Sequence, residues 1–136
     1  MSSAVRIPPQ GGQWLGFDLE QVMAAVGSQE DLSWHMSGAW IVCRDDAPDK
    51  WQRLADQSNQ PNGVPMTWTE MESLAQDCLQ VIDGRFTGRR GDDPLLSLAA
   101  IDSSYWIVWA AEREVLDRVR GAFSGVEDYD EPPPLQ

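Results

Sequence analysis

One histidine and a few clustered carboxylates are the side chains through which this chain could do acid–base chemistry. His35 is the only histidine, and no serine or cysteine close to it forms a motif of nucleophilic catalysis. A triad with Ser103 or Ser104 and a distant aspartate stays open, because such groups meet in space rather than in sequence. The pattern around His35 instead predicts a histidine on the polar face of a strand.

A second group of residues could frame a pocket at one end of a sheet. This group contains Asp83, Arg85 and Asp102, which are near residues typical of turns, and also His35. In such a pocket the two carboxylates would lie close to an arginine. General acid–base chemistry needs such carboxylates in differently tuned environments. The other interpretation is turn chemistry, in which the neighbouring glycines adopt backbone angles that other residues avoid.

Two acidic clusters could ligate a hard cation through oxygen. One contains Asp45, Asp46 and Asp49, and the other contains Asp92 and Asp93. Neither spacing matches the EF-hand loop, which needs alternating ligands, a central glycine and a late glutamate. We therefore predict no metal ion and no cofactor, and expect solvated turns in which aspartates bond to nearby amides.

The net charge of −12 favours some classes of binding partner and disfavours others. It repels nucleic-acid phosphates and anionic lipids, so no nucleic-acid or membrane partner is predicted. It attracts a cationic protein in a salt-dependent way, although it also serves solubility alone. The densest basic patch, Arg85, Arg89 and Arg90, is nearly neutralised by adjacent aspartates, so it is a weak candidate for phosphate binding.

Two tryptophans flank the acidic turn and are the candidates for a protein-binding surface. Trp40 precedes Asp45, Asp46 and Asp49, and Trp51 follows them. Tryptophan surrounded by charge is a frequent interface anchor, whereas burial in the core is the alternative for each.

The predicted compartment is the cytoplasm. The N-terminus has the proline pair Pro8-Pro9 where a signal peptide needs an apolar stretch, and no run reaches the length of a membrane span. Cys43 and Cys78 lie in no CxxC pair and would stay reduced there.

Periodicity predicts the elements that position these residues. Capping boxes begin helices at Asp18 and Thr67, and a third helix covers 112–123. Strands are expected over 32–44, 81–88, 95–101 and 105–110, the last with apolar residues on both faces. Ser37-Gly38 interrupts the first of these strands as a bulge or, preferably, as the turn of a hairpin. One or two helical turns are also expected around Trp51.

These elements predict an α+β fold, with three helices packed on a mainly antiparallel sheet of about four to six strands. One domain should cover 14–126. Residues 1–13 are expected to form an N-terminal tail, and residues 127–136 an acidic, proline-rich C-terminal tail; either segment could instead form an extended edge. The sequence does not predict an oligomeric state.

The stretch 67–123 resembles small uncharacterised bacterial proteins, some of them similar to immunity proteins. The resemblance lies in the capped helix, in Val81-Ile82-Asp83-Gly84-Arg85-Phe86, in Asp102-Ser103-Ser104-Tyr105-Trp106 and in the final helix. It implies a protein that neutralises a partner toxin, but no functional residues to carry over. The predicted function is a non-catalytic acidic module that binds a basic protein; the alternative is a small-ligand-binding protein or hydrolase-like enzyme.

Overall fold

A computed structural model describes residues 3–11 and 16–134, which form one sheet and four helices. In chain order the elements are β1 (Ala4–Ile7), α1 (Leu19–Val26), β2 (Ser33–Cys43), α2 (Lys50–Gln57), β3 (Val64–Met66), α3 (Trp68–Asp77), β4 (Cys78–Arg90), β5 (Asp93–Ile101), β6 (Tyr105–Ala110), α4 (Arg113–Ala122) and β7 (Glu127–Tyr129).

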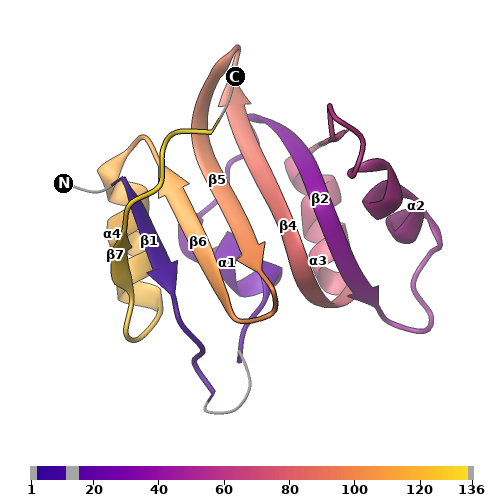
Figure 1. Ribbon diagram of the computed structural model, residues 1–136, viewed down its shortest axis with the longest axis horizontal. Helices are drawn as coiled ribbons and strands as arrows, with labels where there is room; N and C mark the ends of the chain where they lie inside the picture. The colour runs from indigo at the N-terminus through magenta and orange to yellow at the C-terminus, as the bar shows by residue number, and fades with distance from the viewer. Residues whose placement is uncertain (1–2, 12–15, 135–136) are drawn as a thin grey trace.

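The sheet has seven strands in the order β3-β2-β4-β5-β6-β1-β7, and every neighbouring pair is antiparallel. α1, α3 and α4 lie behind one face of this sheet, and α2 lies beside β2 at the edge of the sheet (Figure 1). The predicted α+β class is thus confirmed. The expected counts were too low, because α2 was expected only as one or two helical turns, and because β1, β3 and β7 are only three or four residues long.

The two predicted tails are part of the sheet, which corrects the boundaries of the expected domain. β1 lies between β6 and β7, with Ala4 opposite Trp109 and Tyr129. The first tail was predicted from prolines and glycines that follow β1, although Ala4, Val5 and Ile7 are buried. The second was predicted from its acids, but β7 is an edge strand that α4 supports through the Arg120–Asp128 ion pair.

β2 is one bent strand, so the preferred hairpin at Ser37-Gly38 is wrong. Gly38 has a φ of +60°, and the register with β4 shifts between Ser37 and Trp40. Beyond this bulge the outer edge of β2 bonds to α2 and the turn after it. The amide of Ala39 donates to Ser58 Oγ at 2.9 Å, and Gln52 donates to the carbonyl of Ile41 at 3.2 Å.

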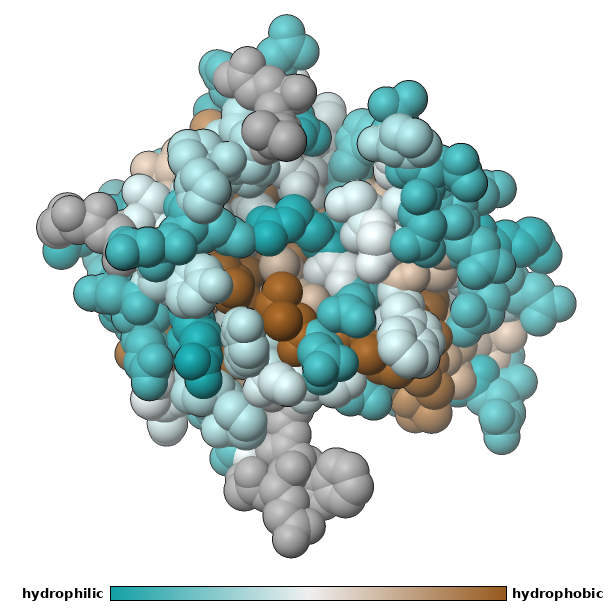
Figure 2. Space-filling view, in the orientation of Figure 1, coloured by the Kyte–Doolittle hydropathy of each residue, from teal (hydrophilic) through white to brown (hydrophobic). Residues whose placement is uncertain are grey.

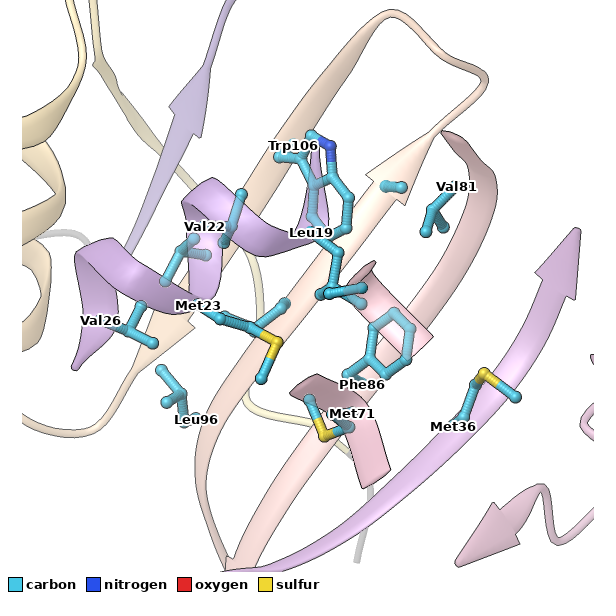
Figure 3. Packing of buried hydrophobic residues seen from close by; sticks show 14 of the residues in the cluster. Leu19, Val22, Met23, Val26, Met36, Met71, Val81, Phe86, Leu96 and Trp106 are labelled. Atoms are coloured by element: carbon cyan, nitrogen blue, oxygen red, sulfur yellow. The ribbon is translucent and has the colours of Figure 1, made fainter. Parts of the chain in front are cut away.

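The main core lies between the sheet and the helices (Figure 3). The apolar side of α1 packs against β4, β5 and β6, and α3 packs beside α1. The core residues labelled in Figure 3 are Leu19, Val22, Met23, Val26, Met36, Met71, Val81, Phe86, Leu96 and Trp106. Both predicted capping boxes form. Glu70 donates its amide to Thr67 Oγ1 at 3.0 Å, and Gln21 accepts from the amide of Asp18 at 2.8 Å.

A second, smaller apolar cluster lies on the opposite face, as expected from the two-sided pattern of 105–110. Ala4, Ala99, Ile107 and Trp109 are at most 5% exposed, and Tyr129 packs against them. Residues 130–134, called the strap below, leave β7 and cross β6 and β5 toward β4 on this face (Figure 1). The face that the strap crosses is called the strap face.

Candidate functional site

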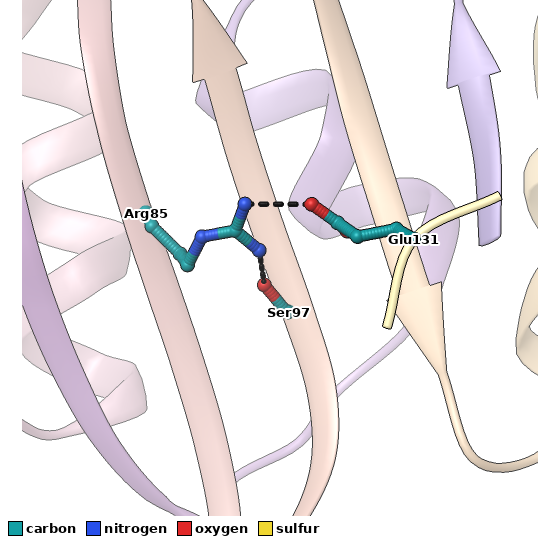
Figure 4. Close-up of polar contacts among 3 residues, drawn as sticks. All are labelled: Arg85, Ser97 and Glu131. Atoms are coloured by element: carbon teal, nitrogen blue, oxygen red, sulfur yellow. Dashed lines mark hydrogen bonds and ion pairs between the residues drawn. The ribbon is translucent and has the colours of Figure 1, made fainter. Parts of the chain in front are cut away.

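An ion pair joins the strap to the middle of the sheet (Figure 4). Arg85 on β4 binds Glu131 Oε1 at 2.7 Å and donates to Ser97 Oγ on β5, also at 2.7 Å. Ser97 is completely buried, and the side chains of Arg85 and Glu131 are 34% and 14% exposed, so water screens this pair only in part. Arg85 is thereby held flat across β5.

A groove of about 980 Å³ lies between the strap and the first half of β2. His35 and Ser37 of β2 and three residues of β4 form its floor: Arg85, Thr87 and Arg89. Its walls are Glu131 with the prolines that follow it and the turn 61–63. The floor presents two guanidinium groups, an imidazole and two hydroxyl groups, a set that suits an anionic ligand.

The structure brings together only part of the predicted pocket. His35 and Arg85 border the same groove, whereas Asp83 borders a different hollow beside Trp40. Asp83 Oδ1 accepts the amide of Asp102 at 2.8 Å, and Ser103 donates to the carbonyl of Ile82 at 2.9 Å. These bonds tie the β5–β6 turn to β4, so turn chemistry accounts for Asp83 and Asp102.

The backbone conformation of the β5–β6 turn, residues 102–104, can be tested by substitution with glycine. Asp102 and Ser103 have φ values of +49° and +58°, a conformation that glycine adopts without the strain of a Cβ atom. Ser103→Gly should raise the free energy of unfolding by about 0.5–1 kcal/mol, as measured by urea denaturation. Ser104→Gly, the same change at a residue with negative φ, should lower it. Equal effects of the two substitutions would contradict this account.

The structure also exposes an apolar patch where β2 ends and β4 begins. Its members, called the Trp40 patch below, are Trp40 (61% exposed), Val42 (40%) and Leu79 (58%). Hydrophobic residues gather over this corner in the space-filling view (Figure 2). Trp40 and Val42 alternate with the buried Ala39 and Ile41, so they point away from the helices.

Carboxylates border the Trp40 patch. Asp56 and Asp83 line a hollow of about 360 Å³ next to Trp40, and the exposed Asp45, Asp46 and Asp49 follow directly after β2. An apolar centre with a charged rim is the usual anatomy of a protein interface.

Trp51 does not belong to this patch, which corrects its prediction as an exposed anchor. It is 1% exposed, and its indole N–H donates to Asp77 Oδ2 at 2.7 Å. The amphipathic helix α2 turns Trp51 inward toward α3, and Lys50 covers its ring at 4.5 Å. The acidic loop thus connects the exposed Trp40 to a tryptophan that is buried in the core.

The thiols are poorly suited to nucleophilic catalysis. Burial raises the pKa of Cys78 to about 12, and burial also raises the pKa of Cys43. A thiol reacts as the thiolate, which these environments disfavour at neutral pH. Among the described residues, no group of three or more His, Cys, Asp or Glu side chains is arranged to hold a metal ion.

Sequence reasoning missed the groove, although a signal for it was present. Arg85, Thr87 and Arg89 alternate along β4 and so share one face. In the sequence, these arginines are close to aspartates that nearly neutralise their charge. In the strand, however, their side chains point to the strap face. Glu131 was missed because it was assigned to a tail.

The fold and its surfaces define an α+β protein with one helical layer, an exposed apolar patch and a strapped groove. Family models, curated proteins and solved structures gave no match to this chain. Across the described residues, each helix is too short or too polar to cross a bilayer.

Proposed function

We propose that this protein is a non-catalytic binding module that docks a basic protein on the Trp40 patch. The observation that carries the proposal is the exposure of Trp40, at 61%, beside Val42 and Leu79. Full burial of an aliphatic side chain contributes about 1.5–3 kcal/mol, and Val42 and Leu79, at 40% and 58% exposed, lack about half of that contribution. A partner that covers the patch would recover that free energy.

Charge argues for a basic partner. The chain carries −12, and the loop that follows β2 adds three exposed aspartates beside the patch. Opposite charge at the rim speeds association and orients the partner, while the desolvated aromatic centre supplies most of the affinity. An immunity-type protein that neutralises a basic toxin is the specific form of this function that we propose.

Capture from an extract of the native host tests the proposal. Immobilised wild-type protein should retain a basic protein at low salt, identified by mass spectrometry, and release it as salt rises. Trp40→Ala should weaken the purified complex about 30- to 1,000-fold, the range for an aromatic anchor.

Two further variants serve as controls. Asp46→Asn should slow association and change the affinity only slightly, because it removes one rim charge. Glu114→Ala on the exposed side of α4 should leave binding unchanged. Recovery of no partner, or equal retention by Trp40→Ala, would contradict the proposal.

A further inference from the structure

The groove under the strap is a second surface, separate from the Trp40 patch. His35 and Ser37 lie before the bulge of β2, whereas Trp40 and Val42 lie after it. Both halves of the strand present these side chains on the face away from the helices. The groove is basic, although the chain as a whole is strongly acidic.

The strap has the chemistry of a peptide ligand. It is an extended segment, Asp130-Glu131-Pro132-Pro133-Pro134, whose glutamate pairs with Arg85 and whose prolines border the groove. Proline holds the backbone extended before binding, so little conformational entropy is lost when such a segment docks. The structure therefore already contains one acidic, proline-rich segment that is bound to Arg85 along one side of this groove.

Several polar atoms on the strap face are buried without a partner among the described residues. They are Oε2 of Glu131, Nε of Arg6 and Nε1 of Trp109. Arg6 instead lies over the ring of Tyr105 at 4.7 Å. Buried polar atoms normally find hydrogen-bond partners, so the fit between strap and face is incomplete.

We propose that Arg85 and the groove beside it bind an extended, acidic, proline-containing segment of a partner protein, and that the strap occupies the position on Arg85 in the free protein. Glu131 is only two residues beyond Tyr129 of β7. This short tether gives the strap an effective concentration of roughly millimolar or more, so an external segment must compete with it. The proposal does not depend on the function assigned to the Trp40 patch.

The probe is the amidated peptide Asp-Glu-Pro-Pro-Pro, titrated into ¹⁵N-labelled protein. A chain ending at Asp130 keeps β7 but lacks Glu131 and the prolines. It should bind the peptide at least tenfold more tightly than the full chain does, with amide shifts at Arg85, Thr87 and Ser97. Replacing the peptide's glutamate by glutamine should weaken binding several-fold, because the charge-assisted bond to Arg85 is lost.

A second variant covers the case in which the shortened chain does not fold. Full-length Glu131→Gln keeps the strap but weakens its hold, so it should bind the peptide more tightly than the wild type does. Adding Arg85→Ala should abolish that gain. A folded shortened chain that ignores the peptide at millimolar concentration would overturn the proposal, as would equal binding by wild type and Glu131→Gln.

Light scattering distinguishes a second copy from a partner protein. The wild-type chain should remain monomeric over the concentrations used in the titration. A dimer that forms with the wild-type strap and is lost in the chain ending at Asp130 would show exchange of straps between copies. That result would replace the proposed partner segment by a second molecule of this protein.

Discussion

Replacing Trp34 by alanine is expected to lower the free energy of unfolding by about 3–5 kcal/mol. Trp34 is 1% exposed, and its ring centroid lies 5.4 Å from that of Trp68 at the start of α3. Its indole N–H donates to the carbonyl of Gln29 at 3.0 Å. The substitution would leave a cavity between sheet and helix and an unpaired carbonyl, and urea denaturation measures the loss.

The backbone of β4 at Gly88 lies against Trp34 and cannot easily move to fill this cavity. A Cβ atom on Gly88 would lie 2.9 Å from Cζ2 of Trp34, so the indole rests directly on the backbone of β4. A paired strand cannot move far enough to fill the space. A domain of this size has about 5–15 kcal/mol of stability, so a large part of it would be lost.

Trp40→Ala provides a matched control on the same strand. Trp40 is 61% exposed, so its removal should change the free energy of unfolding by less than about 0.5 kcal/mol. One tryptophan of β2 should thus affect stability, and the other should affect only binding. Similar stability losses in the two variants would contradict the packing described for β2.

Asp18→Asn is expected to stabilise the protein at neutral pH by on the order of 1–3 kcal/mol. Burial raises the pKa of Asp18 from 3.8 to about 6, against the opposing effect of the Val81 and Leu19 amides. Its Oδ2 accepts from the amide of Val81 at 3.0 Å, while Oδ1 is buried without a partner among the described residues. Asparagine keeps an acceptor for Val81 and caps a helix about as well as aspartate does.

The sign of the pH dependence follows from the raised pKa. Between pH 3.8 and about 6 the folded state binds more protons at Asp18 than the unfolded state does, so stability falls as pH rises. The contribution of protonated Asp18 is complete below pH 3.8 and is lost above about pH 6. The advantage of Asp18→Asn should accordingly be small near pH 3.5 and largest above pH 7.

Urea denaturation at both pH values measures this difference. Asp46→Asn makes the same chemical change at an exposed loop position, so it should alter stability by less than about 0.5 kcal/mol. An Asp18→Asn variant that is less stable than the wild type at pH 7.5 would show that the ionised carboxylate is needed to hold Val81.

Local patterns predicted the elements that have clear ends and clear faces. The capping boxes at Asp18 and Thr67 form, and Tyr105–Ala110 places Trp106 in the main core and Trp109 in the second cluster. Trp51 was harder to place, because the acidic turn beside it suggested exposure. Its burial depends on Asp77, a residue of another helix.

Long-range pairing decided the features that the sequence did not predict. Ala4–Ile7 is too short to be recognised by alternation, and it becomes a strand because β6 and β7 supply bonds on both sides. The groove needs Arg85 of β4 and Glu131 of the strap to meet. No local signal connects these two residues, so their pairing could only be seen in three dimensions.

The insertion of β1 between β6 and β7 has a consequence for folding during synthesis. Ala4 is translated before its partner Trp109, and the elements from α1 to β5 are made between them. Closing such a long loop is slow, and until then β6 presents an unpaired edge to other nascent chains. We therefore expect β1 to be among the last strands to fold although it is translated before β6, and protection from aggregation to matter most at that stage.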